Sequence, residues 1–385
     1  MAYNKYYLQK KQVSYDNGLT WEDVTPSETR QGAYIDSYQT LAECEGDYSK
    51  QYLTFESLED NNAISWIAGA IAGGGITAKT ISASTDNGVT WTAYTSTTGG
   101  TTIATLNAGD KLLIKGENTA YGHNSVNKFV STGQFNAYGN IMSMISGDSF
   151  DEATTLTEAM AFQTLFGGCT GLTSAEHLIL PATTLTDTCY VSMFNGCTNL
   201  TTAPSILPAT TLTSNCYMWM FYNCTNLTTA PELPATTLAN SCYQQMFGYC
   251  TSLVNAPELP ATTLANSCYD SMFLGCTSLT TAPELPATTL ANWCYTNMFN
   301  NCTSLTTAPT LSSTKLVYRC YNAMFYNCTS LSAITCLATD ISATGCLSNW
   351  VQNVAATGTF VKDANTTWTT GVSGIPDGWT VQNNS

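Results

Sequence analysis

Charged residues are scarce in this 385-residue sequence, and basic residues are the scarcest. Only 10% of the residues are charged, and 12 Lys and Arg stand against 27 Asp and Glu, which gives a net charge of −15. A chain without a basic stripe cannot displace the counterions around phosphates, so nucleic acid and anionic membrane surfaces are excluded as partners. Only two histidines and no Cys-x-x-Cys pair are present, so we expect no zinc site.

Long apolar runs and catalytic motifs are also missing. The longest apolar stretch, residues 64–76, is short and rich in glycine, which argues against a membrane-spanning helix. The first residues, Met1-Ala2-Tyr3-Asn4-Lys5, do not begin a signal peptide, which predicts synthesis in a cytoplasm without secretion by the usual route. The sequence has no Gly-rich phosphate loop, Gly-x-Ser-x-Gly elbow or Ser/His/Asp set. We therefore expect no enzyme activity, no cofactor and no membrane insertion.

What the sequence does contain is a repeat of 26 residues, with one spacing of 27. Its opening hexapeptide, Leu-Pro-Ala-Thr-Thr-Leu, begins at Leu180, Leu207, Leu233, Leu259 and Leu285, with looser copies at Leu311 and Leu337. Self-similarity at such a period predicts a solenoid, in which each unit buries its apolar face only against its neighbours.

One half of each repeat has the spacing of a short helix. In residues 268–276 the apolar positions are i, i+1, i+4, i+5 and i+8, which is one helical stripe. Suitable N-cap residues precede it, namely Asp187, Ser214, Asn240, Asn266 and Asn292. The second Cys follows a residue that tolerates the left-handed backbone at a helix end, namely Gly168, Gly196, Asn223, Gly275, Asn301 or Asn327.

The other half has the spacing of a strand. Residues 279–283 alternate apolar and polar before a proline, which predicts a short strand stacked in parallel on its copies about 4.8 Å apart. The sequence therefore predicts an α/β leucine-rich-repeat solenoid over residues 151–356, with one short parallel strand and one short helix in each repeat. We expect residues 357–385 to form a C-terminal β cap, because a solenoid must cover its apolar ends.

The chain has 16 cysteines, and most of them form two columns in the repeats. Within a repeat the two cysteines are eight residues apart, which is about 12 Å along a helix and too far for a disulfide. We therefore predict that the repeat cysteines are free and buried.

The motif Met-Phe-x-Gly-Cys-Thr-x-Leu-Thr resembles the leucine-rich repeats of bacterial surface proteins of the treponemal type, and the related repeats of mycoplasma lipoproteins. The resemblance covers roughly residues 160–350. It implies a role in adhesion and implies no chemistry.

Two Asp-boxes, Ser-x-Asp-x-Gly-x-Thr-Trp, stand before the repeats at residues 14–21 and 84–91. Each predicts a hairpin, in which Asp and Asn accept turn amides and Gly supplies a positive φ. Sialidases also carry Asp-boxes, but they hold the substrate carboxylate with three arginines, and this chain has only Arg30 and Arg319. We interpret the boxes as features of the fold, residues 1–45 as an arm with one hairpin, and residues 46–150 as a β-sandwich-like spacer.

Residues 3–6 (Tyr-Asn-Lys-Tyr), 13–18 (Val-Ser-Tyr-Asp-Asn-Gly) and 133–144 (Gly-Gln-Phe-Asn-Ala-Tyr-Gly-Asn-Ile-Met-Ser-Met) resemble fibre and adhesin-like proteins of phages and prophages of gut Bacteroidetes. The resemblance implies a virion protein, assembled in the host cytoplasm and later extracellular. Its N-terminal arm would anchor it to other virion proteins, and its solenoid would bind a host-surface protein or polysaccharide. Two other functions stay open: a purely structural capsid or tail decoration that contacts other virion proteins, and a bacterial surface adhesin. Homo-oligomerisation is open for each of them.

Comparison of the repeats with one another suggests where a ligand binds. The strand side is nearly uniform, whereas the helix side varies into aromatic residues, which together with one arginine are candidates for ligand binding: Trp219, Tyr222, Tyr249, Trp293, Tyr318, Arg319 and Tyr326. The alternative is that these side chains only cover neighbouring helices. Glu232, Glu258 and Glu284 form a column that is either simply solvated or a weak candidate for a cation site.

Overall fold

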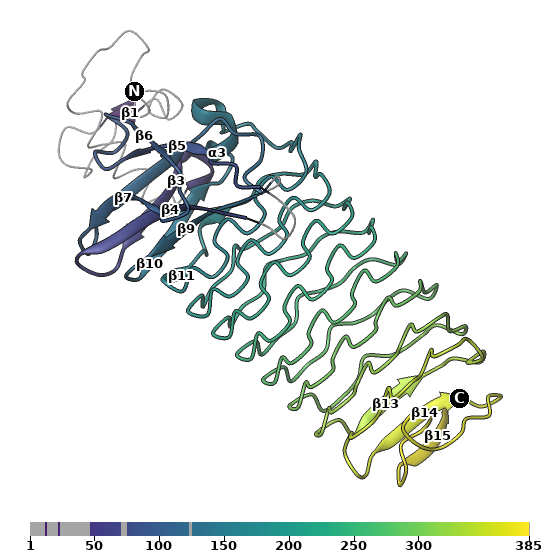
Figure 1. The fold of residues 1–385 in the computed structure, drawn as a ribbon. Helices are drawn as coiled ribbons and strands as arrows, with labels where there is room; N and C mark the ends of the chain where they lie inside the picture. Colours follow the sequence, from purple (N-terminus) through teal and green to yellow (C-terminus); the bar gives the residue numbers. More distant parts are fainter. Residues whose placement is uncertain (1–11, 14–21, 24–46, 71–74, 123–124, 385) are drawn as a thin grey trace.

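The structure is a computed structural model that describes residues 12–13, 22–23, 47–70, 75–122 and 125–384. The first Asp-box and most of the predicted N-terminal arm lie outside the described residues. Two short strands of that region, β1 (Gln12–Val13) and β2 (Glu22–Asp23), pair antiparallel. From residue 47 onward the chain forms an elongated stack of coils, with a β domain at one end and a small sheet at the other (Figure 1).

The N-terminal domain is built from two facing groups of strands. Its elements are η1 (Tyr48–Lys50), β3 (Leu53–Ser57), β4 (Asn62–Ala70), β5 (Thr80–Ser84), β6 (Thr92–Thr95), β7 (Thr101–Leu106), β8 (Lys111–Lys115), β9 (Ser125–Ser131), β10 (Phe135–Asn140), α3 (Ser143–Ser146) and η2 (Gly147–Ser149). One sheet has the order β10-β3-β8-β5-β6 and the other β7-β4-β9. Phe55 of the first sheet and Phe129 of the second are fully buried, with ring centroids 4.9 Å apart, so the core lies between the two sheets.

The second Asp-box is a hairpin turn between β5 and β6, as predicted. The Asp86 carboxylate accepts the Thr90 N–H at 2.9 Å and the Thr90 and Ser84 hydroxyls at 2.6 Å, and Gly88 has a φ of 84°. These hydrogen bonds, first from Ser84 and then from Thr90, lower the pKa of Asp86 to about 2. The box therefore fixes a turn, and its carboxylate is fully engaged in doing so.

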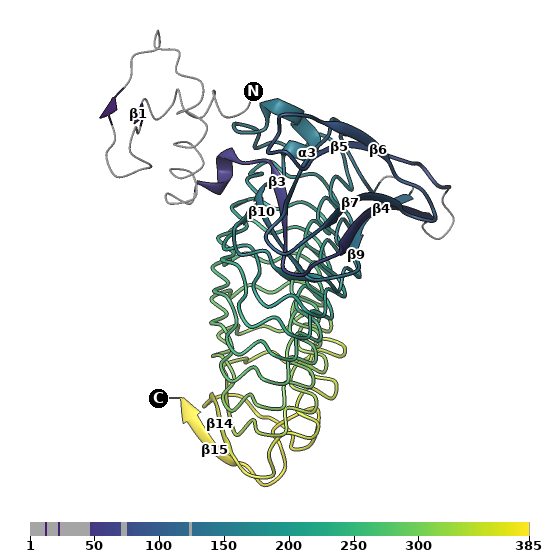
Figure 2. The ribbon, with the colours of Figure 1, turned by 90° about the vertical axis from the view of Figure 1, so that its left-hand side faces the viewer.

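The sheet of the N-terminal domain continues directly into the first repeats. Strand β10 pairs in parallel with β11 (Leu172–Ser174) and β12 (Leu178–Ile179), while its other edge pairs with β3. Phe166 of the first coil packs on Phe55 and Phe129, with ring centroids 5.8 Å away in both cases. The domain thus covers one end of the stack without a break in the core (Figure 2).

The predicted helix in each repeat is absent. Among the described residues the only α-helix is α3, and no described helix could cross a membrane. Residues 267–276 and their copies, here called the turn segments, have left-handed backbone at every fourth residue, with φ values of 55° at Ser267, 57° at Ser271 and 72° at Gly275. A right-handed helix cannot contain such residues repeatedly. The predicted α/β leucine-rich-repeat solenoid, with its helix in every repeat, is therefore wrong.

Hydrogen bonds in the turn segments alternate between two directions. Tyr269 and Phe273 donate their N–H groups to carbonyls of the next coil, at 3.1 and 3.0 Å, whereas Met272 donates to the carbonyl of Tyr269 at 3.2 Å. Successive four-residue turns therefore bond within a coil through one set of amides and between coils through the other. This pattern satisfies the buried backbone without helix or regular strand.

The residues interpreted as helix caps have other roles. The N-cap column links the coils: the carbonyls of Asn240, Asn266 and Asn292 accept amides from the preceding coil at 3.0 Å. The Asp187 and Asn266 side chains also accept amides of the following coil, from Ser214 and Asn292 at 3.0 and 3.1 Å. The Gly and Asn residues before the second Cys have left-handed backbone, as predicted. They do not end a helix, however, because each is the last of several left-handed residues in its turn segment.

Identical side chains stack in columns inside the coils. The phenylalanine rings from Phe166 to Phe325 lie parallel, with successive centroids 5.2–5.7 Å apart. The second cysteine of each repeat donates its thiol to the carbonyl of the preceding coil's phenylalanine, as in Cys276 to Phe247 at 3.1 Å. All 15 described cysteines are free and buried, which confirms that prediction for them; Cys44 lies outside the described residues.

The uniform side of the repeats makes single parallel bridges rather than strands. Such bridges join Thr202 to Thr229, Asn255 to Thr281 and Thr237 to Thr263. Regular strand pairing returns only at the C-terminal end, where β13 (Ala333–Cys336), β14 (Thr359–Asp363) and β15 (Thr380–Asn384) form a parallel sheet. Beside it Trp350 ends the phenylalanine column, 6.1 Å from Phe325, and packs on Trp368. These residues cover the other end of the core.

Candidate ligand-binding surface

Three of the predicted ligand-binding aromatics form one cluster, cluster A, on two adjacent coils. It consists of Trp219, Tyr222 and Tyr249. The Tyr222 and Tyr249 rings meet edge to face with centroids 5.4 Å apart, and the Trp219 indole N–H donates to the Gln245 side-chain oxygen of the next coil. Trp219 and Tyr249 remain 37% and 39% exposed, so the cluster presents ring surface to solvent.

Two glycines of the neighbouring coils make room for the tyrosines of cluster A. A Cβ atom at Gly248 would lie 2.9 Å from the Tyr222 ring, and one at Gly275 would lie 2.7 Å from the Tyr249 ring. Each ring therefore rests on bare backbone one repeat further along. The alternative interpretation, that these aromatics only cover neighbouring repeats, changes in one respect: what they cover is a coil and not a helix.

A second cluster, cluster B, joins Trp293 to Tyr318 and Arg319 of the next coil. The Trp293 and Tyr318 rings meet edge to face with centroids 5.0 Å apart, and the Arg319 guanidinium lies 5.4 Å from the Tyr318 ring centroid. Trp293 is 36% exposed and Arg319 is exposed. This arrangement combines an apolar ring surface with a cation held against an aromatic face.

Tyr326, the seventh candidate, lies apart from both clusters. It is half-buried on the same coil as Tyr318, and no ring contact among the described residues connects it to cluster A or cluster B. We therefore leave it out of the ligand-binding surface argued below.

Four of the clustered residues have backbone that is unfavourable for their side chains. Trp219, Tyr249, Trp293 and Arg319 have φ values of 57°, 61°, 56° and 53°. The left-handed region costs an ordinary residue about 1–2 kcal/mol. Most other repeats place Ser, Asn or Gly at these positions, such as Ser271, Gly275 and Ser267. Thr188, Gln245 and Ala323 are among the other exceptions. Large side chains kept at strained positions favour a function over chance variation.

The glutamate column lies on a different side of the coils. Glu232, Glu258 and Glu284 are all exposed. Glu232 and Glu258, with prolines such as Pro231 and Pro257, line an open groove of about 500 Å3. Among the described residues no group of three or more His, Cys, Asp or Glu side chains is arranged to hold a metal ion. The geometry thus favours a solvated column.

We expect millimolar calcium to leave the melting temperature unchanged, because exposed carboxylates on neighbouring coils repel each other by only about 0.8 kcal/mol in water. The measurement is thermal unfolding with calcium and with excess chelator. A calcium-dependent rise in melting temperature that disappears in Glu258→Gln would show instead that the column binds the ion.

One pocket in the N-terminal domain was not predicted from the sequence. Tyr48, Tyr138 and His177 meet there, although 129 residues separate the first from the last. In the sequence His177 is one of only two histidines and belongs to no motif. Nothing in the local pattern signals the pocket, because it is assembled by the parallel pairing of β10 with the first repeat.

Comparison with protein-family models, with curated proteins and with solved structures gives no match for this chain.

Proposed function

We propose that this chain is a non-enzymatic phage virion fibre or adhesin-like protein whose clusters A and B bind a host-surface glycan. The observation that supports it best is the presence of exposed aromatic side chains at left-handed positions where most other repeats carry Ser, Asn or Gly. Binding sites commonly depend on a few Trp, Tyr and Arg side chains. The assignment to a virion comes from the sequence resemblance of residues 3–6, 13–18 and 133–144.

The chemistry of the two clusters suits a sugar more than a charged polymer. A pyranose ring has an apolar C–H face that packs on an aromatic face, and hydroxyl groups that need donors and acceptors around it. Gln245 beside Trp219 and Arg319 beside Tyr318 supply such groups. The net charge of −15 opposes long-range attraction to anionic surfaces. Two clusters on one stack would let a long glycan bind at both with increased avidity.

Replacing Trp219 and Trp293 by Ser is expected to weaken binding to host cells by about 30-fold or more, the effect of losing a binding hot spot. Ser is chosen because Ser271 and Ser267 occupy the same positions in another repeat, so the coils should keep their fold. The measurement is binding of fluorescently labelled chain to host cells, with melting temperature as the check on folding.

The matched control is Val254→Thr, which changes an exposed residue on the uniform side to the residue that Thr228 and Thr280 provide in neighbouring repeats. We expect it to bind as the unmodified chain does. If the double Trp variant folds and binds cells unchanged, the proposal fails. If that variant instead loses binding to purified virions, the surface contacts other virion proteins and the chain is a decoration protein.

A further inference from the structure

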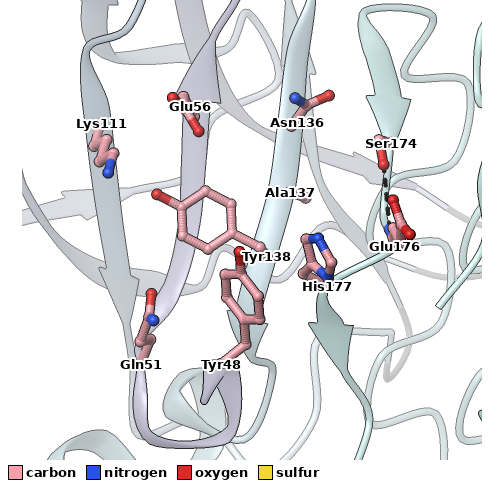
Figure 3. A pocket seen from close by; sticks show the side chains of 10 residues that line it. All are labelled: Tyr48, Gln51, Glu56, Lys111, Asn136, Ala137, Tyr138, Ser174, Glu176 and His177. Atoms are coloured by element: carbon pink, nitrogen blue, oxygen red, sulfur yellow. Dashed lines mark hydrogen bonds between the residues drawn. The ribbon is translucent and has the colours of Figure 1, made fainter. Parts of the chain in front are cut away.

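A pocket on the N-terminal domain lies outside clusters A and B. It has a volume of about 430 Å3, within the range of about 300–1,000 Å3 typical of ligand sites. It forms where η1, β3, β8 and β10 meet the first repeat. Its lining, shown in Figure 3, includes Tyr48, Glu56, Lys111, Asn136, Tyr138 and His177.

Polar side chains form a row across four neighbouring strands at one side of this pocket. Lys111 of β8 is paired with Glu56 of β3, Glu56 with Asn136 of β10, and Asn136 with Ser174 of β11. Paired residues of adjacent strands point to the same face of a sheet, so the four side chains lie side by side (Figure 3). The row offers a cationic donor, an anionic acceptor, an amide and a hydroxyl in succession.

Asn136 has a defined orientation in this row. Its side-chain oxygen accepts the Thr173 hydroxyl at 2.8 Å. Among the described residues no hydrogen-bond partner takes its NH2 group. Asn136 is half-buried, so this NH2 group is a donor at the pocket that a ligand oxygen can satisfy.

An aromatic group forms the other side of the pocket. Tyr138 follows Asn136 by two residues on β10 and therefore lies on the same face of the sheet. Tyr48 stacks on His177 with ring centroids 4.4 Å apart and an interplanar angle of 7°, and it meets Tyr138 edge to face at 5.4 Å. The Tyr138 ring stands between Glu56 and Tyr48 in the middle of the pocket (Figure 3).

The lining carries charges of both signs, with two carboxylates against one ammonium group. An anionic ligand would meet Glu56 and Glu176, and a cationic ligand would meet Lys111. Like charges brought together in a partly buried site are unfavourable. A neutral ligand with both hydroxyl donors and hydroxyl acceptors can use all of these groups at once.

We propose that this pocket binds a neutral pyranose residue of a glycan, with the C–H face of the sugar against Tyr138 and its hydroxyls on the row from Lys111 to Ser174. An aromatic platform beside a short line of mixed donors and acceptors matches the two sides of such a ring. The site uses none of the residues of clusters A and B, so either proposal can fail without the other.

Saturation-transfer-difference NMR on the full chain tests this site with a panel of methyl glycosides. The neutral probes are the methyl glycosides of glucose, mannose, galactose and N-acetylglucosamine; the charged probes are methyl glucuronide and methyl glucosaminide. We expect transfer to the ring C–H protons of at least one neutral glycoside. Tyr138→Ser should weaken its binding by about tenfold, the size of one lost aromatic contact.

His177→Ala is the second variant, because His177 is exposed and its ring positions Tyr48 without supporting the core. It should also weaken binding, while Trp219→Ser with Trp293→Ser should leave this pocket unchanged. The proposal is overturned if no neutral glycoside shows transfer, or if a charged glycoside binds as well as the neutral ones. It is also overturned if His177→Ala and a folded Tyr138→Ser both keep the native affinity.

Discussion

Above about pH 9 the protein should lose stability steeply, because its core is filled with thiols whose ionisation is disfavoured by burial in the folded state. Burial raises the pKa of the Cys242 and Cys276 thiols to about 12, from an ordinary value of 9.0. The stacked tyrosines add to the effect: burial raises the pKa of Tyr243 well above its ordinary value of 10.0. Protonated thiols are therefore favoured in the folded chain more than in the unfolded chain.

The direction and window of the effect follow from these values. The stabilisation is fully present below the unfolded pKa, near 9, and is lost as pH rises from there toward the folded pKa, near 12. Each such thiol removes about 1.4 kcal/mol per pH unit within the window. Six of them together remove about 8 kcal/mol per pH unit, which is comparable to a typical total stability of about 5–15 kcal/mol. The six thiols with a pKa of about 12 are those of Cys189, Cys242, Cys276, Cys320, Cys328 and Cys336.

Urea unfolding between pH 7 and pH 11 in the presence of a reductant measures this dependence. Cys276→Ala is the matched variant: it should lower stability at pH 7 yet flatten the alkaline slope by about 1.4 kcal/mol per pH unit. A free energy of unfolding that stays constant from pH 8 to about pH 10 would mean that the thiols are not buried as the structure shows.

Replacing Phe247 by Ala should cost about 3–5 kcal/mol, the usual loss for a buried phenylalanine. Its ring is fully buried between Phe221 and Phe273, with centroids 5.6 and 5.7 Å away and interplanar angles of 2° and 5°. Each coil packs only on its neighbours, so the cavity would interrupt the stack in the middle rather than at an end. The measurement is the free energy of unfolding in denaturant.

The control for this variant is Leu274→Asn in the next turn segment. Leu274 lies outside the inward columns, and Asn195 and Asn300 stand at the same position in other repeats. We expect a change within about 0.5 kcal/mol, as for an ordinary surface substitution. Equal losses for Phe247→Ala and Leu274→Asn would contradict the assignment of the phenylalanine column to the core.

The period of the repeat and its buried columns could be predicted from the sequence, but the backbone of the turn segments could not. Apolar residues at i, i+1, i+4, i+5 and i+8 fit an α-helix of 3.6 residues per turn and also a chain of four-residue turns. Over only nine residues, a period of 3.6 and a period of four place the apolar residues at the same positions. The distinguishing signal is the Ser, Gly or Asn residue that most repeats carry at every fourth position, as in Ser267, Ser271 and Gly275, where a helix needs only one at its end.

The candidate ligand residues were predicted from variation among repeats, but their grouping was not. Repeat comparison identifies Tyr222 and Tyr249 as outward-facing aromatics, yet it cannot show that they meet edge to face over Gly248 and Gly275. The pocket around Tyr138 is harder still, because the row from Lys111 to Ser174 depends on the register of three strand pairs. Such registers are set by the hydrophobic core and not by the polar residues themselves.

The most direct test of the proposed function is a glycan array probed with two forms of the full chain. Both carry His177→Ala, so that the N-terminal pocket contributes little; one also carries Trp219→Ser, Tyr222→Asn, Tyr249→Gly and Trp293→Ser, each the residue of another repeat at that position. We predict that the first form binds a defined set of glycans and that the second, with a similar melting temperature, does not. Binding of the same glycans at equal intensity by both forms, or of none by the first, would contradict the assignment of glycan binding to clusters A and B.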